Sequence, residues 1–399
     1  MKSGVMENMY NKAREIHDEI VDFRRDLHRH PEVSGQEFRT QQKIIEELEK
    51  MGVEYKKAGR TSVIAFIRGN NPGKTVMLRG DIDALPVKEE SDVEFKSEED
   101  GKMHACGHDF HTSMLLGALK ILNQYKDDLN GEIRFFFQEA EETFEGAKNI
   151  IKEGFLDGVD VCLGIHDHPL LEVGKATIKR GELTAGCDTI YVHFEGMSGH
   201  GSTPHLAKDT IHPACVFVEN LQAIVTKNTD AQQAIVLSVG KFSGGTKANI
   251  IAKNTDLDIS MRYFNPKTRL IVHDAIKRHA KAIADMFEIK VDIDIVQSAP
   301  SVYNDEEIAE VVSGAWAKVA GEGNEEPMEH YADTPKLMGS EDFSYYLEQV
   351  KGVMVWLGGG NKEIGAVYPH HHEKFKLDEN MIDYGVALYS QFTLDYLEM

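Results

Sequence analysis

Apolar residues recur every three or four positions at the start of the chain. Between residues 8 and 29 they include Tyr10, Ile16, Ile20 and Leu27, which is the spacing of one face of an amphipathic helix. Short apolar runs bounded by glycine or proline follow, with helical patterns between them, as is typical of an α/β domain with a mostly parallel sheet. We predict helices over 8–29, 38–50, 111–125 and 144–153, and strands over 62–68, 75–78, 132–137 and 159–165.

The pattern changes near residue 185. Ile190, Val192 and Phe194 alternate with polar residues, as in a strand with one buried face. The segments that follow have the strand–helix–strand–strand–helix–strand order of a ferredoxin-like α+β unit. We predict strands over 189–195, 233–242, 256–264 and 290–296, with helices over 210–227 and 267–287.

After Pro300 the earlier pattern returns. It predicts a helix over 305–320, a polar loop over 321–340, an apolar run over 353–357 and a closing helix over 379–397. A chain of 399 residues is also long for a single core, so two domains are expected. We therefore place a larger domain at 1–185 and 298–399 and an inserted domain at 186–297.

The charge balance argues against some classes of partner. The chain has 44 Lys and Arg against 66 Asp and Glu, a formal net charge of −22. Nucleic acids and anionic membrane surfaces favour basic patches, so neither is expected as a partner. No window approaches the roughly 18 apolar residues of a membrane span, and the first residues lack the apolar core of a signal peptide. We expect a cytoplasmic protein.

The densest chemistry lies in HACGHDFHT at 104–112. It places Cys106, His108, Asp109 and His111 close together just before an apolar helical pattern. Thiolate, imidazole and carboxylate are groups that bind transition metals. The chain has only four cysteines, too few for a disulfide scaffold, and Cys106 is the one inside a histidine cluster. We interpret Cys106 and His108 as candidate metal ligands.

Further donors follow strand-like runs, where open α/β sheets place their chemistry. Glu141 and Glu142 follow the run 132–137, His166 and His168 follow 159–165, and three histidines occupy 370–372. One of the two adjacent acids could bind a metal while the other takes a proton from an activated water. One cysteine, three histidines and one or two glutamates exceed a single tetrahedral site and favour two metals. Such ligands accept Zn²⁺, Mn²⁺, Co²⁺ or Ni²⁺.

With these motifs in place, the chain resembles the N-acyl-L-amino acid amidohydrolases, the group of aminoacylases, hippuricases and auxin-conjugate hydrolases. The resemblance implies an α/β, metal-dependent exopeptidase-like catalytic domain with an inserted ferredoxin-like α+β lid and dimerisation domain, and a homodimer or larger homo-oligomer. It covers nearly the whole chain in order. The matching segments are FRRDLHRHPEVSGQEFRT at 23–40, GDIDALPV at 80–87, HACGHDFHTSMLLGA at 104–118, FQEAEETFEGAKNI at 137–150, GIHDHP at 164–169, SGHGSTPH at 198–205, GGTKANII at 244–251 and GSEDFSYY at 339–346.

The resemblance also implies residue roles. Glu141 would be the general base, Asp83 would orient a metal ligand, and His200 of the inserted domain would stabilise the oxyanion in a partner subunit's active site. The resemblance implies substrate contacts by Asn249 and Arg262, which would bind the substrate carboxylate, and by His111. The implied ligands of a dinuclear centre, with the thiolate bridging, are Cys106, His108, Glu142, His166 and His371.

Three segments depart from the family pattern. Glu139 stands where proline is usual, and Asp167 and His168 replace more apolar residues. The sequence HHHEKF at 370–375 replaces HSPxF, which leaves His370 and His372 as alternatives to His371. These changes predict a pocket more polar than that of enzymes accepting large aromatic acyl groups.

The expected reaction is metal-dependent hydrolysis of the amide bond of a small-molecule substrate, an N-acyl-amino acid with an N-acetyl or aromatic acyl group, giving a carboxylate and a free amino acid. A metal-dependent dipeptidase or carboxypeptidase is the alternative with the same chemistry, in which Glu139 or Asp167 could hold a substrate α-amino group. A non-catalytic metal- or peptide-binding relative is the alternative from another class. A serine hydrolase is not expected, because the chain has no GxSxG motif.

Overall fold

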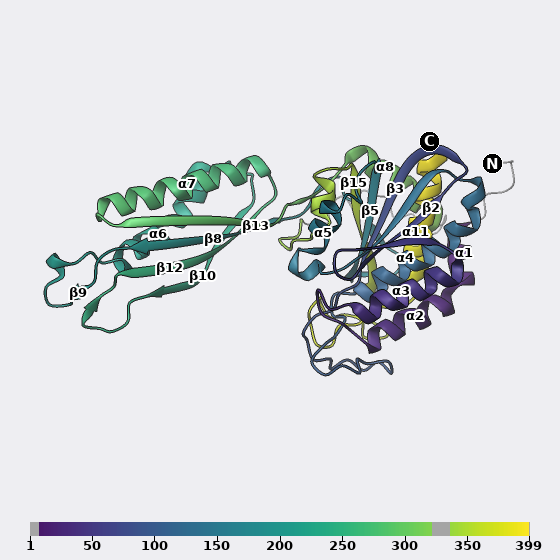
Figure 1. The fold of residues 1–399 in the computed structure, drawn as a ribbon, viewed down its shortest axis with the longest axis horizontal. Coiled ribbons are helices and arrows are strands. Elements are labelled where there is room, and N and C mark those ends of the chain that lie inside the picture. Colours follow the sequence, from purple (N-terminus) through teal and green to yellow (C-terminus); the bar gives the residue numbers. More distant parts are fainter. Residues whose placement is uncertain (1–7, 321–335, 399) are drawn as a thin grey trace. The chain divides into compact units, whose positions relative to one another are not determined.

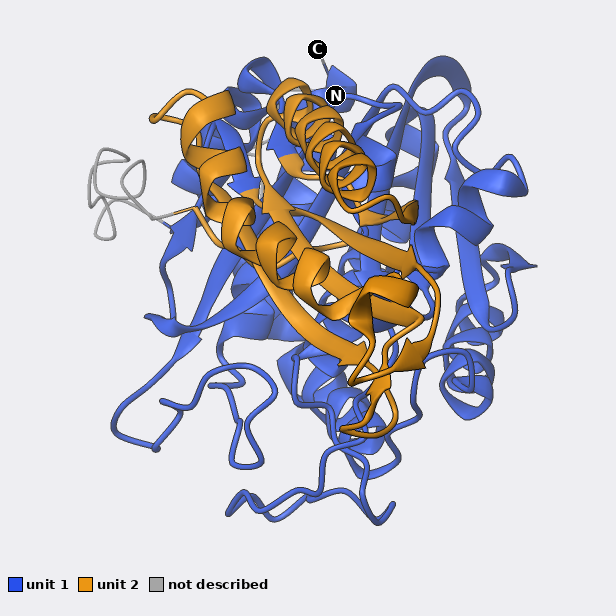
Figure 2. Cartoon of the chain, turned by 90° about the vertical axis from the view of Figure 1, so that its left-hand side faces the viewer, with its two compact units in different colours: residues 1–183, 303–335, 342–399 blue, residues 184–302, 336–341 orange. Residues whose placement is uncertain are grey.

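The computed structural model describes residues 8–320 and 336–398. The chain forms two compact units, coloured separately in Figure 2. Unit 1 comprises Met1–Leu183, Tyr303–Pro335 and Asp342–Met399, and unit 2 comprises Thr184–Val302 and Lys336–Glu341. The insertion expected at 186–297 falls inside unit 2. Residues 321–335 of the expected polar loop lie outside the described residues.

Unit 1 is built on a seven-stranded sheet with the order β1-β2-β4-β3-β5-β15-β6. Its four central strands pair in parallel, and the outer strands run antiparallel to their neighbours. Strand β15 lies beside β5 although the two are far apart in sequence (Figure 1). The strands are β1 (Glu54–Ala58), β2 (Ser62–Arg68), β3 (Asn71–Asp81), β4 (Asn130–Gln138), β5 (Val161–Glu172), β6 (Ala176–Thr177) and β15 (Gly352–Gly360).

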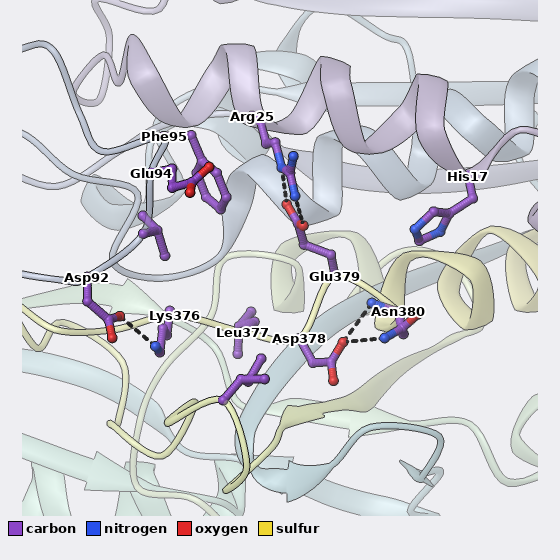
Figure 3. Close-up of a pocket in the computed structure, with 12 residues that line it drawn as sticks. His17, Arg25, Asp92, Glu94, Phe95, Lys376, Leu377, Asp378, Glu379 and Asn380 are labelled. Atoms are coloured by element: carbon purple, nitrogen blue, oxygen red, sulfur yellow. Dashed lines mark hydrogen bonds and ion pairs between the residues drawn. The ribbon is translucent and has the colours of Figure 1, made fainter.

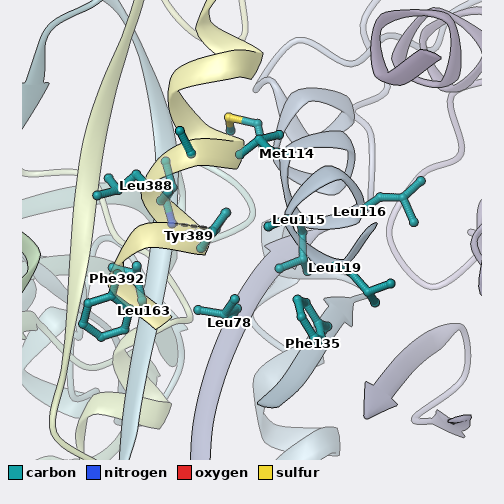
Figure 4. Close-up of a cluster of buried hydrophobic side chains, with 14 of the residues drawn as sticks. Leu78, Met114, Leu115, Leu116, Leu119, Phe135, Leu163, Leu388, Tyr389 and Phe392 are labelled. Atoms are coloured by element: carbon teal, nitrogen blue, oxygen red, sulfur yellow. Dashed lines mark hydrogen bonds between the residues drawn. The ribbon is translucent and has the colours of Figure 1, made fainter. Parts of the chain in front are cut away.

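The helices of unit 1 complete its core. Met114 and Leu115 of α4 pack with Tyr389 of α11 and Leu78 of β3 (Figure 4). The Tyr389 hydroxyl donates to the carbonyl of Arg79 at 2.6 Å and accepts from the amide of Ile165 at 3.0 Å, so α11 ties β3 to β5. The helices are α1 (Met9–Glu15), α2 (His17–Arg29), α3 (Phe38–Met51), α4 (His108–Leu122), α5 (Gly146–Lys152), α8 (Glu306–Ala320), α10 (Ser344–Leu347) and α11 (Met381–Glu398), with 3₁₀ turns η1 (Asn123–Asp128) and η2 (Glu141–Thr143).

Unit 2 contains a four-stranded antiparallel sheet with the order β10-β12-β8-β13. Apolar residues on one face of the sheet, such as Ile190, Val192 and Phe194, pack with apolar residues of α6 and α7. The ferredoxin-like prediction is confirmed. The elements are β8 (Gly186–Glu195), α6 (Ile211–Asn228), β10 (Ile235–Gly244), β12 (Asn254–Tyr263), α7 (Pro266–Met286) and β13 (Lys290–Ala299), with the short pairs β9 (Gly199–His200) and β11 (Ile250–Ile251), and β7 (Gly181–Thr184) and β14 (Val302–Asn304), and the 3₁₀ turn η3 (Pro204–Leu206).

Three local features differ from the predictions. The helix expected over 8–29 is interrupted at Ile16, whose φ of −108° and ψ of 7° leave the helical range. Strand β1 was not predicted, because its sequence EYKKA is mostly exposed at a sheet edge. Strand β5 continues past the expected end at residue 165 to Glu172, since β15 pairs with it along that extension. Among the described helices, none is both long and apolar enough to cross a membrane.

Candidate metal centre

The candidate donors meet at one edge of the unit 1 sheet. Strand β3 ends at Asp81, and Asp83 follows it; β4 ends at Gln138, and Glu141 follows in η2. These are the carboxyl ends of neighbouring parallel strands, the edge at which open α/β sheets bind ligands. His166 is contributed from within β5.

The start of α4 brings a second group of donors to this edge. Cys106 lies just before the helix, and His108 is its first residue. Between them, Gly107 has a φ of +80°, and a Cβ atom there would lie 2.1 Å from Oδ1 of Asp167. Glycine is therefore required both for the left-handed backbone and for the close approach of Asp167.

A strained turn presents the two adjacent glutamates. Ala140 and Phe144, on either side of η2, have φ values of 53° and 58°. Left-handed backbone at residues other than glycine is costly and clusters at functional sites. The carboxylate of Glu37 supports the turn by accepting the Ala140 amide at 2.9 Å. This turn places both Glu141 and Glu142 at the carboxyl edge of the sheet.

The five expected ligands come together in this region. In each of three groups the ligating atoms lie within 4.8 Å of one another: Cys106 with His108 and His166, Cys106 with Glu142 and His371, and His108 with Glu141 and Glu142. Cys106 belongs to two groups, which suits a thiolate shared by two ions. Its Sγ is 3.8 Å from Nε2 of His166, and Nε2 of His371 is 3.3 Å from Oε1 of Glu142.

The histidine hydrogen bonds leave nitrogens available to a metal. His108 donates from Nδ1 to Oδ1 of Asp83 at 3.0 Å, and His166 donates from Nδ1 to the carbonyl of Asp167 at 2.9 Å. These bonds fix the tautomer that presents Nε2 as a ligand. Nε2 of His108 is buried without a hydrogen-bond partner, and the buried Oε1 of Glu142 lies 3.3 Å from Nε2 of His371. A buried polar atom without a partner needs an explanation, and a divalent cation fits both atoms.

The electrostatics of the protein alone favour protonated ligands. Burial, and then the charge of Glu142, raise the pKa of the Cys106 thiol well above its ordinary value. Burial would lower the pKa of His108, but Asp81 and Cys106 raise it well above its usual range. A bound cation reverses both preferences, because it stabilises the thiolate and the neutral imidazole.

Asp81 and Asp342 are functional candidates that the sequence analysis missed. Asp81 pairs with Arg79 at 2.5 Å and accepts from Nδ1 of His111 at 2.6 Å. Asp342 accepts from Arg79 at 2.8 Å, and its backbone amide donates to Oε1 of Glu141 at 3.4 Å. The available signals were the first aspartate of GDIDALP and the aspartate of GSEDFSYY.

His111, which the resemblance assigns to substrate contact, lies in the interior of unit 1. Its side chain is fully buried, and its ring nitrogens lie against Asp81 and Asp167, the latter at 3.1 Å. This geometry suits a residue that holds carboxylates in position.

Glu139 and Asp167, two of the residues expected to make the pocket more polar, are engaged in hydrogen bonds inside unit 1. Glu139 is buried and accepts hydrogen bonds from the backbone amides of Arg60 and Thr61 and from the side chain of Asn149. Burial would raise the pKa of Asp167, but His370 and His111 hold it well below its ordinary value. Both carboxylates are thus engaged inside the protein, because buried acids must be hydrogen-bonded or paired.

The three consecutive histidines have separate environments. His371 is the one that joins Cys106 and Glu142 in a group of possible ligands. His370 donates from Nε2 to Oδ2 of Asp167 at 2.8 Å, and His372 stacks on Tyr368 with ring centroids 4.6 Å apart.

The remaining expected residues belong to unit 2, whereas all candidate ligands belong to unit 1. His200 is exposed in β9, and its Nδ1 is 2.7 Å from the Ser202 hydroxyl. Asn249 is exposed just before β11. Arg262 is half-buried in β12 and donates to the hydroxyl of Ser340 at 2.6 Å.

A separate cavity of about 450 Å³ lies elsewhere in unit 1 (Figure 3). Two ion pairs line it: Arg25 with Glu379, and Lys376 with Asp92 at 2.5 Å. Its lining includes no cysteine, and its one histidine, His17, pairs with Asp383, so the metal-binding donors described above lie elsewhere.

Comparison with known proteins agrees with this geometry. Residues 77–395 match the model of peptidase family M20/M25/M40. The chain is 34% identical to Thermostable carboxypeptidase 2 of Saccharolobus solfataricus and 34% identical to N-acetylcysteine deacetylase of Bacillus subtilis, in both cases over 98% of this chain and 99% of the relative. It is 42% identical to the N-acyl-L-amino acid amidohydrolase of Geobacillus stearothermophilus over 68% of this chain and 74% of that protein.

A solved structure supports the fold in the same way. The YXEP protein of Bacillus subtilis, a dinuclear metal binding peptidase from the M20 family, superposes with a TM-score of 0.83 at 32% identity, covering 97% of this chain and 99% of that one.

Proposed function

The chain belongs to peptidase family M20/M25/M40, and we propose that it hydrolyses the amide bond of N-acyl-amino acids to a carboxylate and a free amino acid. It is a metal-dependent amidohydrolase acting on a small-molecule substrate. The observation that carries the proposal is the cluster around Cys106, in which the ligating atoms of Cys106, His108 and His166 and those of Cys106, Glu142 and His371 lie within 4.8 Å of one another, and Nε2 of His108 is buried without a hydrogen-bond partner.

We assign two divalent ions, Zn²⁺, Mn²⁺, Co²⁺ or Ni²⁺, to Cys106, His108, Glu142, His166 and His371. Thiolate, imidazole and carboxylate together suit any of these ions. When bound, such ions polarise the scissile carbonyl and lower the pKa of water.

Glu141 is the proposed proton carrier. Its carboxylate takes a proton from the attacking water and later gives one to the nitrogen of the departing amino acid. The amide of Asp342 donates to Oε1 of Glu141 and so holds the carboxylate in place. Asp83 has the supporting role of fixing the His108 ring.

Unit 2 supplies the proposed substrate contacts. Arg262 carries the planar guanidinium that pairs with a carboxylate through two hydrogen bonds, and the exposed Asn249 is the second proposed contact. His200, also exposed, is assigned to the oxyanion in the active site of a partner subunit, which requires a homodimer or larger homo-oligomer. We place the enzyme in the cytoplasm, because a ligating thiolate needs a reducing compartment.

A peptidase is the competing function, and one of the relatives is a carboxypeptidase. A dipeptide substrate presents an α-amino group that needs an acidic partner. The two acids expected for that task, Glu139 and Asp167, are both engaged inside unit 1. The structure therefore favours substrates whose amine is acylated.

The test is release of free amine from N-acetyl-amino acids, N-benzoyl-amino acids and dipeptides. The protein is stripped of metal and then reloaded with Zn²⁺, Mn²⁺, Co²⁺ or Ni²⁺. We expect metal-dependent release from the N-acyl substrates, and the ranking of acyl groups defines the pocket. Release from dipeptides alone would overturn the proposal in favour of the peptidase.

A further inference from the structure

The side chain of Asp167 lies where three segments of unit 1 meet. It is fully buried in β5, next to His166. Its Oδ1 is 3.1 Å from Nε2 of His111 in α4, and its Oδ2 accepts from Nε2 of His370 at 2.8 Å. The glycine at position 107 gives Oδ1 the space it occupies.

The side chain of His371 has little packing support of its own. The His371 side chain is 53% exposed, and its backbone is left-handed with a φ of 65°. Its amide donates to the carbonyl of Ala105 at 2.7 Å. An exposed side chain on a strained residue has little packing of its own to hold it in a ligating position.

We propose that Asp167 and His370 are positioning residues that hold His371 in register with the other ligands. The proposal rests on the assigned function only in taking His371 as a ligand. Two consecutive residues then anchor the loop to the two segments that carry other ligands. The backbone of His371 is bonded beside Cys106, and the side chain of His370 is bonded beside His166.

Asp167 and His370 contact different sets of segments. The ring of His370 contacts Asp167, the ring of His166 with centroids 5.1 Å apart, and the ring of Phe375 with centroids 5.5 Å apart. Its loss therefore removes one anchor of the loop and one neighbour of His166, while the contact of Asp167 with His111 of α4 remains. Asp167 also contacts His111 and fills the space at Gly107, so its loss disturbs α4 as well. His370 is therefore the cleaner position to test, and its side chain is 26% exposed, which limits the effect of substitution on folding.

The same loop provides a matched control. His372 stacks on Tyr368, and its Nδ1 accepts the amide of Lys374 at 3.0 Å. Its ring bonds to its own loop, whereas the ring of His370 bonds to β5. Substitution of His372 thus removes an imidazole from the loop and keeps the anchor to Asp167.

The experiment measures metal affinity by chelator competition with Zn²⁺ for H370A, H370Q, D167N and H372A. We expect H370A to bind one Zn²⁺ about 10- to 100-fold more weakly, the usual effect of losing a hydrogen-bonded partner behind a ligand. H372A should match the wild type, and H370Q should recover most of the loss because its amide can still donate to Asp167. The double variant D167N/H370A should lose less Zn²⁺ affinity than the sum of the two single losses, expressed as free energies, since both substitutions remove the same contact between Asp167 and His370.

The Cys106→Ala variant separates this inference from the proposed function. If C106A loses Zn²⁺ and H370A binds as the wild type does, the positioning role is wrong and the metal centre stands. If C106A retains both ions, the assigned centre itself is wrong. Equal losses in H370A and H372A would show general sensitivity of the loop and would also overturn the positioning role.

Discussion

At the scale of single residues, the centre depends on which nitrogen each histidine leaves free. Asp83 and the carbonyl of Asp167 occupy Nδ1 of His108 and of His166. Both rings then turn Nε2 toward the thiol of Cys106. The chemistry of the site is thus set by oxygen atoms that are not themselves ligands, which is the general behaviour of outer partners at metal sites.

Replacing Glu141 by glutamine tests the proton carrier. We expect E141Q to keep its metal and lose turnover by roughly 10²- to 10⁴-fold, because an amide cannot accept the proton. The measurements are kcat and the metal-to-protein ratio. Glu145→Gln is the control, since Glu145 is an exposed glutamate nearby. Turnover within tenfold of the wild type would remove Glu141 from the mechanism.

Glu37 gives a prediction about pH. Burial, and then the charge of Asp83, raise the pKa of Glu37 from 4.5 to about 7. Between these values the folded protein holds a proton that the unfolded chain releases, so stability falls as pH rises. E37Q has no proton to lose. The difference in the free energy of unfolding, E37Q minus wild type, should therefore increase by up to roughly 3 kcal/mol from pH 4 to pH 8.

Urea denaturation at several pH values measures this difference. The glutamine also gives up one acceptor, because Glu37 receives hydrogen bonds from the hydroxyl of Thr61 and from the amides of Gly35 and Ala140. That loss shifts the free energy of unfolding by the same amount at every pH, whereas the raised pKa of Glu37 changes how the free energy of unfolding depends on pH. A difference between the two proteins that is the same at every pH would contradict the assigned pKa.

At the scale of elements, the start of α4 is the most constrained part of the site. Gly107→Ala adds a methyl group 2.1 Å from Oδ1 of Asp167 and keeps a φ of +80°. Gly101→Ala is the matched control, with a φ of +75° and no atom within 4 Å of the new carbon. The control should lower the free energy of unfolding by about 1–2 kcal/mol, because alanine is less stable than glycine in a left-handed backbone. We expect G107A to cost more and also to weaken metal binding, as measured by denaturation and chelator competition.

Elements with a strong apolar pattern could be predicted from the sequence. Strand β2 and the helix α3 lie where their spacing places them, since each buries a continuous face. Strand β1 has no such face, and the extension of β5 depends on pairing with β15, a contact that no local pattern contains.

The site shows the same division. Residue types and motifs indicated the ligands, but the burial of Asp167 and its bond to His370 depend on how distant segments pack. The sequence predicts a pocket position for Asp167 because it stands beside the ligand His166 where the family has a more apolar residue. The glycine at 107 that admits its carboxylate is sixty positions earlier in the chain.

At the scale of the whole molecule, the proposed role of His200 predicts complementation between subunits. E141Q and His200→Ala should each be nearly inactive. Co-expressed in equal amounts, the two variants should pair at random, so that about half of the dimers are mixed. Each mixed dimer has one intact site of two, which gives about a quarter of the wild-type activity. If His200 serves its own chain, the mixture stays as inactive as its parents. Light scattering on the same sample checks that dimers form.

The position of β15 between β5 and β6 also orders events in time. The chain makes Cys106, His108 and His166, then all of unit 2, and only later β15 and His371. At usual rates of synthesis the gap between His166 and His371 is on the order of tens of seconds. A nascent chain therefore displays a thiol and two imidazoles long before their last partner exists. The insertion of unit 2 postpones completion of the metal centre until the ribosome has passed residue 371.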